Sequence, residues 1–246
     1  KAQRKPLKTP NRFKGMQGLE EPSDSMHRQI KRLSEYLNVL PLTSLSIDNI
    51  EADDSIAYIA KSVLKDSKVS IMSTDKDFLQ LVDDRINVWS PTKKALYDRS
   101  KIAEEYDMLA ENLIYFRIID GDKSDNINGI KGYGLKTTLK KMPFLKDKII
   151  YNIEDFLKET SEFGYVNKDV LTRNYKLMQL SDVEISGSAK SKILNIVNEV
   201  PNRLVKYKLH KMFLEDTINQ VIKNPDVWLQ DTFNRLDMVI NNASNS

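Results

Sequence analysis

The feature that most constrains this chain is an alternation of apolar, strand-like runs with helical segments. Residues 68–73 (KVSIMS) form a short, nearly all-apolar run of the kind that is buried on both faces of a parallel sheet. Further strand-like runs lie at 42–47, 86–90 and 93–98, and residues 51–65 show helical periodicity. This order predicts an α/β fold, with helices flanking a mainly parallel sheet.

The pattern changes near residue 100, where strands give way to helices. Residues 100–120 are helical in pattern, 121–134 are typical of a loop, and further helical segments follow. We therefore predict an α/β domain over 1–119, which includes a basic segment at its start, and a helical region over 120–246.

The composition excludes several classes of protein. The chain has 246 residues and 40% hydrophobic residues, which is enough for a sizeable core. It has no Cys and only two His, which excludes a disulfide scaffold and thiolate metal sites and leaves little room for a zinc centre. No apolar run approaches the ~18–20 residues that span a membrane, and no signal peptide is visible, so we expect no membrane association.

Acidic residues gather where strand-like runs end or where the α/β part gives way to helices. The three clusters are Glu51, Asp53 and Asp54; Asp75 and Asp77; and Asp120, Asp122 and Asp125. Each cluster alone is explained by helix capping, because acidic side chains at helix N-termini bind exposed N–H groups. In an open α/β sheet, however, ligands bind beyond the carboxyl ends of the strands. Three clusters at one such edge would repel one another unless cations neutralised them.

The ligand set of these clusters points to a particular kind of cation. Oxygen ligands without Cys or a nearby His suit Mg²⁺ or Mn²⁺ rather than zinc. Glu51 and Asp54 are spaced to lie on one face of a helix. Two such cations about 3.5–4 Å apart activate water and hold a phosphodiester for displacement. The clusters therefore predict a two-metal site for phosphodiester hydrolysis.

A glycine-rich loop supplies the second motif. The segment 121–142, GDKSDNINGIKGYGLKTTLKKM, places glycines just before a helix rich in Lys and Thr, where backbone N–H groups can approach a phosphate. No G-K-[ST] closes it, so it is not a Walker loop. A plain connection between two helices is the alternative to a grip on nucleic acid that is independent of sequence. The candidate DNA contacts are Gly129, Lys131, Gly132, Gly134, Lys136 and Thr137.

These motifs, in this order, resemble the 5′-nuclease superfamily. The family includes flap endonucleases, the 5′→3′ exonuclease domain of bacterial DNA polymerase I and phage 5′-exonucleases, among them the phage enzyme called RNase H. The segments IEADDSIAYIA, STDKDFLQL and the glycine loop carry the likeness, and KAQR and NYKLMQLSDVEI extend it over roughly residues 1–185. The resemblance implies a PIN-like α/β domain, with an arch segment at 1–22, followed by a helix–three-turn–helix DNA-binding motif.

The resemblance also implies roles for the residues that match. Metal ligation falls to Glu51, Asp53, Asp54, Asp75, Asp77, Asp122 and Asp125. Lys1 and Arg4 match arch cations that contact the scissile phosphate, although a basic segment can also be simply solvated. Residues 129–137 match the hairpin that grips duplex DNA and in relatives holds a K⁺ ion.

One part of the family pattern is missing. The family's first strand carries a metal-binding Asp, whereas residues 1–40 contain no apolar strand followed by Asp. We therefore expect this chain to lack the start of the fold and one wall of the metal site.

Three functions follow as candidates. The first is a Mg²⁺-dependent, structure-specific 5′-nuclease that acts on DNA flaps, 5′ overhangs or RNA–DNA primer junctions. The second is a non-catalytic junction binder, or one half of a split nuclease. The third is a PIN-type ribonuclease, against which the glycine hairpin argues. We expect a monomeric, stand-alone protein of the bacterial cytoplasm, or of a phage-infected host, with replication proteins as partners.

Overall fold

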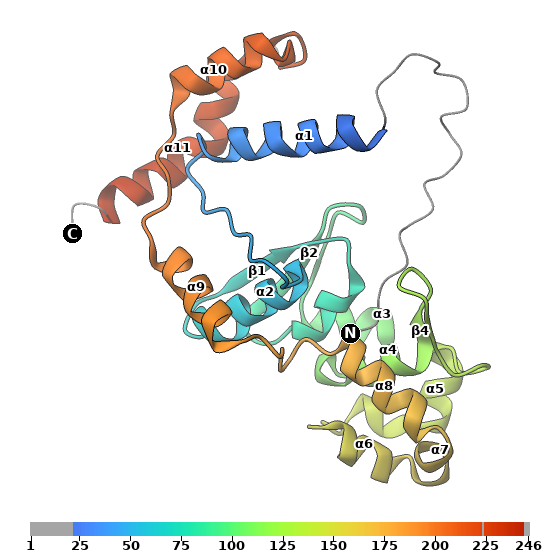
Figure 1. The fold of residues 1–246 in the computed structure, drawn as a ribbon. Helices are drawn as coiled ribbons and strands as arrows, with labels where there is room; N and C mark the ends of the chain where they lie inside the picture. The colour runs from blue at the N-terminus through green and yellow to red at the C-terminus, as the bar shows by residue number, and fades with distance from the viewer. Residues whose placement is uncertain (1–21, 223, 244–246) are drawn as a thin grey trace. The chain divides into compact units, whose positions relative to one another are not determined.

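The computed structural model describes residues 22–222 and 224–243. These residues fall into two compact units (Figure 1). Described residues up to Ser46 join those from Ser191 onward in one unit, and Ile47–Lys190 form the other. The predicted domain boundary after residue 119 lies inside the second unit and stays a prediction.

The unit Ile47–Lys190 is built around a small sheet of β1 (Val69–Met72), β2 (Ile86–Ser90) and β3 (Ala95–Tyr97), in that order. β1 pairs with β2 in parallel, and β2 pairs with β3 antiparallel. Each strand lies where one was predicted, but the sheet is mixed rather than mainly parallel. The reason is the tight turn at 91–94, because so short a connection can only return the chain antiparallel.

The strand predicted at 42–47 is not formed. The segment is extended, yet it pairs with no strand within the described part of the chain. Thr43, Ser44 and Ser46 are exposed, and the two units meet in the chain between Ser46 and Ile47. The alternating pattern of this segment therefore belongs to a connection and not to a paired strand.

Helices make up most of the second unit. The α-helices are α2 (Ala52–Tyr58), α3 (Arg99–Tyr106), α4 (Leu113–Asp120), α5 (Leu135–Lys141), α6 (Ile153–Glu159), α7 (Ser161–Val166), α8 (Lys168–Met178) and α9 (Gly187–Asn198), which extends past its boundary. A π-helical turn (Ile59–Val63) continues α2, and 3₁₀ helices cover Lys76–Leu81, Ala110–Asn112 and Pro143–Lys146. The helix predicted over 51–65 is thus an α-helix that widens to a π-turn.

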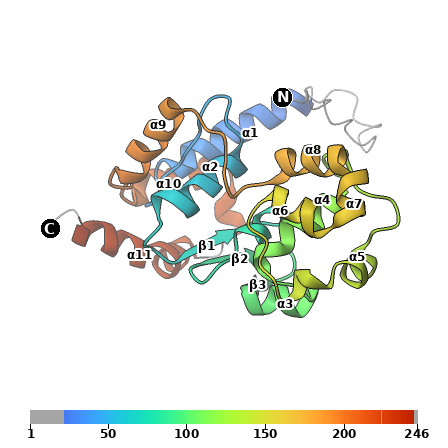
Figure 2. The same cartoon turned by 90° about the horizontal axis from the view of Figure 1, so that it is seen from below.

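Helix α4 is the centre of this unit. Its residues 113–119 are all buried, and it lies beside α8 (Figure 2). The buried Asn174 of α8 donates from its Nδ2 atom to the carbonyl oxygens of Ile118, at 2.8 Å, and Asn128, at 3.0 Å. Because such a buried amide would be costly to leave unpaired, this clamp fixes the chain that leaves α4.

The segment after α4, predicted as a loop, contains a two-stranded hairpin of β4 (Gly121–Asp122) and β5 (Ile127–Asn128). The Cβ of any residue larger than glycine at position 129 would lie 2.2 Å from the carbonyl oxygen of Asp120. One predicted DNA contact, Gly129, is therefore required by the crossing of two backbone segments.

The other unit consists of α1 (Pro22–Leu37), α10 (Lys206–Glu215), a 3₁₀ turn (Ile218–Gln220) and α11 (Pro225–Ala243). Its apolar core includes Leu209, Phe213 and Leu229. Arg32 of α1 donates to the carboxylates of Glu215 and Asp216 at the end of α10, both at 2.7 Å. Among the described residues, no helix combines the length and apolar character needed to cross a bilayer.

Candidate metal and nucleic-acid site

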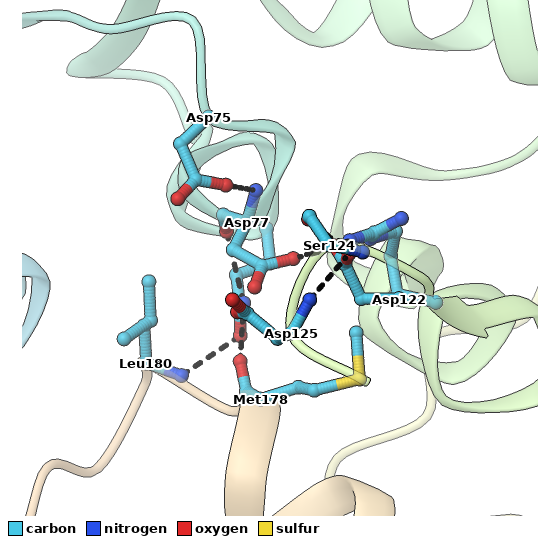
Figure 3. Close-up of polar contacts among 9 residues, drawn as sticks. Asp75, Asp77, Asp122, Ser124, Asp125, Met178 and Leu180 are labelled. Atoms are coloured by element: carbon cyan, nitrogen blue, oxygen red, sulfur yellow. Dashed lines mark hydrogen bonds and ion pairs between the residues drawn. The ribbon is translucent and has the colours of Figure 1, made fainter. Parts of the chain in front are cut away.

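Two of the predicted metal ligands follow directly from the carboxyl end of β1. The Oδ1 atom of Asp75 accepts a hydrogen bond from the Asp77 N–H at 2.9 Å and caps the 3₁₀ helix Lys76–Leu81 (Figure 3). The Ser73 hydroxyl in turn accepts from the Asp75 N–H at 3.1 Å. Asp75 is therefore a helix cap at the sheet edge where a ligand site was predicted, and capping leaves its second oxygen for another role.

A buried arginine joins two of the acidic clusters. The Nη2 atom of Arg117, on α4, lies 2.7 Å from Oδ1 of Asp77 and 2.7 Å from Oδ2 of Asp122. Its Nε atom also donates to Oδ1 of Asp77, at 3.2 Å. The side chains of Arg117, Asp77 and Asp122 are 8%, 13% and 17% exposed. The structure therefore brings Asp77 and Asp122 together across a shared cation.

The electrostatics differ between the two carboxylates. Burial raises the pKa of Asp77, and the hydrogen bonds from Arg117 oppose that shift only in part. Burial also acts on Asp122, but hydrogen bonds from Ser124 and Arg117 outweigh it and lower the pKa of Asp122 to about 2. Asp77 is thus the carboxylate that has most to gain from a further cation.

The hairpin after α4 holds Asp122 and Asp125 in one turn. Oδ1 of Asp122 accepts hydrogen bonds from the Ser124 N–H at 2.8 Å, from the Ser124 hydroxyl and from the Asp125 N–H at 3.4 Å. Figure 3 shows Asp125 on the same side of this turn as Asp77. The third cluster therefore meets the second through Asp122, and the same turn carries Asp125.

Gln80 fixes the backbone that carries Asp77. Its Nε2 atom donates to the carbonyl oxygens of Asp77 at 2.9 Å and Met178 at 2.8 Å, and its Oε1 atom accepts from the Leu180 N–H at 2.9 Å. One amide thus ties the 3₁₀ helix to the end of α8.

The first cluster lies at the start of α2. Glu51 occupies the N-cap position but its side chain does not cap the helix, and Asp53 and Asp54 lie in the first turn. Burial, and then the charges of Asp53 and Glu51, raise the pKa of Asp54. Helix α2 contacts the 3₁₀ helix Lys76–Leu81, so this cluster lies on the element next to Asp75 and Asp77.

The donor atoms suit a hard divalent cation, because the site offers carboxylate oxygens from several elements. Arg117 already offsets part of their charge. Within residues 22–222 and 224–243, however, no three His, Cys, Asp or Glu side chains converge closely enough to hold a metal ion. The described chain thus has the right chemistry for the predicted site and an incomplete geometry.

The glycine loop separates into two parts. A Cβ at Gly121 or Gly129 would strike backbone atoms closer than 3 Å, whereas a Cβ at Gly132 or Gly134 would meet nothing within 4 Å. Gly132 also has a positive φ of 86°. The first pair of glycines serves the fold, and the second pair leaves backbone open on the surface.

Lysines and a packed tyrosine surround the open glycines. Lys131 and Lys136 are exposed, and Thr137 is partly exposed. The ring of Tyr133 packs on that of Phe163 in α7, with centroids 4.6 Å apart, and so braces the loop from behind. Lys1 and Arg4, the predicted arch cations, lie outside the described residues.

Comparisons with known proteins place the chain in a family. Its residues 1–107 match the family model of the 5′-3′ exonuclease N-terminal resolvase-like domain. The chain is 33% identical over 205 residues to a 5′-3′ exonuclease of Aquifex aeolicus, which covers 81% of this chain and 68% of that protein. This chain belongs to the 5′-nuclease superfamily.

Other relatives support the same family assignment. It is 32% identical over 180 residues to a 5′-3′ exonuclease of Buchnera aphidicola, covering 72% of this chain and 62% of the relative. It is 39% identical over 114 residues to DNA polymerase I of Thermus thermophilus, covering 46% of this chain and 14% of the polymerase. The chain thus spans about two thirds of the exonucleases and a small part of the polymerase.

Solved structures support the fold. A bacteriophage T5 flap endonuclease, crystallised with DNA and metal ions, matches with a TM-score of 0.57 at 22% identity, over 74% of each chain. The T5 5′-exonuclease with bound zinc ions matches with a TM-score of 0.52 at 22% identity, over 80% of this chain and 71% of the other. At this identity the likeness shows the 5′-nuclease fold alone.

Sequence reasoning missed Arg117 in this family member. The signal was present, because Arg117 is the one charged residue in the run LIYFRII. A lone charge in an apolar helix needs a buried partner, and only the structure identifies Asp77 and Asp122 as the two partners.

Proposed function

We propose that this chain acts as a structure-specific 5′-nuclease that hydrolyses phosphodiesters of DNA or RNA–DNA near 5′ ends and junctions. The observation that carries the proposal is the meeting of Asp77 with Asp122 at the carboxyl end of β1 in a member of this family. Relatives named 5′-3′ exonuclease and flap endonuclease support the reaction class.

The residues proposed to hold divalent cations are those that present carboxylates at this edge. They are Glu51, Asp53, Asp54, Asp75, Asp77, Asp122 and Asp125. Two Mg²⁺ or Mn²⁺ ions there would lower the pKa of a bound water and stabilise the charge that develops on the phosphate. The protein's own part is to orient these carboxylates and, through the hydrogen bonds from Arg117, to favour the ionised form of Asp77 against the effect of burial.

The glycine loop is proposed to hold the duplex behind the cleaved end. Gly132 and Gly134 leave backbone exposed with room for a phosphate, and Lys131 and Lys136 add positive charge beside it. Contacts of this kind go to phosphates and so do not depend on sequence. We propose a K⁺ ion at 129–137 as a further element of this grip.

A second candidate function has one observation in its favour. Because no three acidic side chains converge within the described residues, the chain could bind a junction without cleaving it. Lys1 and Arg4, which lie outside the part of the chain that the structure describes, belong to the proposed contact with the scissile phosphate.

Substrate preference separates the candidates. The experiment compares end-labelled 5′-flap DNA, an RNA–DNA primer junction and single-stranded RNA, each with Mn²⁺ and with EDTA. The proposal predicts Mn²⁺-dependent release of short 5′ products from the first two. Duplex binding without cleavage at high protein concentration would establish the junction binder. A preference for single-stranded RNA would favour a PIN-type ribonuclease.

We propose further that the protein works as a monomer in a bacterial or phage-infected cytoplasm, together with replication proteins. The bacterial sources of its relatives and the DNA polymerase I likeness support this context. Size-exclusion chromatography with light scattering tests the monomer, and a dimer at micromolar concentration would contradict it.

A further inference from the structure

Arg117 is a charged residue in a buried and otherwise apolar helix, which is an unusual position for a guanidinium. The six other residues of 113–119 are apolar or aromatic, and each is at most 6% exposed. Burying a guanidinium here costs desolvation energy, and an apolar side chain in the same place would not carry that cost. An apolar side chain of similar volume would fill the same space, so the charge itself calls for an explanation.

The contacts of Arg117 are selective. It binds Oδ1 of Asp77 through two nitrogens and Oδ2 of Asp122 through one. Each carboxylate is thereby held by one of its two oxygens. The other oxygen of Asp77 has no hydrogen-bond partner among the described residues, whereas that of Asp122 is held by Ser124.

We propose that Arg117 is a positioning residue for the metal site. It fixes the rotamer of Asp77, so that Oδ2 faces the proposed cations, and links it to the turn that carries Asp122 and Asp125. This inference rests on the proposed function. Arg117 would thus be a residue of the buried helix α4 that acts on the acidic site.

The contacts of Arg117 favour a role in orienting the carboxylates over a role as a charge that competes with metal ions for them. Two nitrogens of the Arg117 guanidinium fork, Nε and Nη2, converge on Oδ1 of Asp77, and Nη2 also donates to Oδ2 of Asp122, so one rigid group restrains both carboxylates. Groups that hold the oxygens of metal ligands from behind typically contribute about 10- to 100-fold to metal affinity. A lysine keeps the charge but makes a single point contact and loses the fork.

The test measures Mn²⁺ affinity from the paramagnetic resonance signal of the free ion, without DNA and without turnover. Mn²⁺ binding that is present in the wild type and lost in Asp77→Asn is assigned to the site. We expect Arg117→Met to weaken that binding ~10- to 100-fold and Arg117→Lys to weaken it less. Circular dichroism establishes that each variant is folded. If Arg117→Met does not fold, Arg117→Lys carries the test, with a several-fold loss expected.

Arg85 provides the matched control. It is also partly buried, but within the described chain its guanidinium donates only to backbone carbonyls, those of Leu64 at 3.0 Å and Ser67 at 3.3 Å among them. Arg85→Met should lower stability and leave Mn²⁺ affinity unchanged. Wild-type or tighter Mn²⁺ binding by the folded Arg117 variants would overturn the inference. Absence of any Asp77-dependent binding in the wild type would instead overturn the proposed function.

Discussion

The crossing of two backbone segments at Gly129 gives the sharpest test of the fold at the site. A Cβ on this residue would lie 2.2 Å from the carbonyl oxygen of Asp120 and 2.3 Å from that of Ile119. Since carbon and oxygen normally approach to about 3.5 Å, the two segments would have to separate by more than about 1 Å. That separation would stretch the hydrogen bond from the Ile130 N–H to Ile119, now 2.7 Å long.

The cost of Gly129→Ala follows from these contacts. Overpacking against immovable atoms costs about 1–3 kcal/mol, and each strained backbone hydrogen bond adds about 1 kcal/mol. We therefore expect Gly129→Ala to lower the free energy of unfolding by about 3 kcal/mol or more. At Gly134 an added Cβ meets nothing within 4 Å and φ is −73°, so Gly134→Ala should change stability by less than about 1 kcal/mol.

Urea unfolding measures both values in a Trp228→Phe background, so that the fluorescence of Trp89 in β2 reports on this unit. Duplex DNA binding supplies the second readout, because the open face at Gly134 is the proposed phosphate contact. Gly134→Ala should keep its stability and weaken duplex binding. A Gly129→Ala protein as stable as the wild type, or equal stability losses at both positions, would refute the reasoning.

Three further predictions concern single side chains. Lys136→Ala should weaken duplex binding and lower its salt dependence by about one charge, as measured by fluorescence anisotropy at several salt concentrations. Gln80→Ala should lower the free energy of unfolding in urea by about 2 kcal/mol, because it removes the side-chain hydrogen bonds to the Asp77 and Met178 carbonyls and from the Leu180 N–H. The lowered pKa of Asp122, about 2, means that its charge stabilises the fold above its ordinary pKa near 3.8 and that this contribution is lost as pH falls toward 2. Asp122→Asn should therefore cost about 2 kcal/mol at pH 7 and much less at pH 2, measured by urea unfolding at both values.

A strand-like sequence pattern predicts a strand correctly only where a neighbouring strand is present to pair with it. The run at 86–90 is β2 from end to end, because its alternation matches a strand with one buried face. The run at 42–47 has a similar pattern and stays unpaired within the described chain. Periodicity indicates which residues avoid water, whereas a strand exists only where a neighbour supplies hydrogen bonds.

The candidate site shows the same division. Motif order was enough to predict the family and the acidic residues that follow β1. Sequence could not show that Asp77 and Asp122 share one guanidinium, since Arg117 lies 40 residues after Asp77. Nor could it separate Gly129, which the fold requires, from Gly134, which the fold leaves open.

The most direct test of the account is single-turnover cleavage of a 5′-flap DNA during a Mg²⁺ titration, comparing the wild type with Asp77→Asn. Duplex binding is measured in parallel in EDTA. We expect cleavage that rises with Mg²⁺ in the wild type and is lost in Asp77→Asn, while the two proteins bind duplex equally. Wild-type cleavage rates in Asp77→Asn would contradict it.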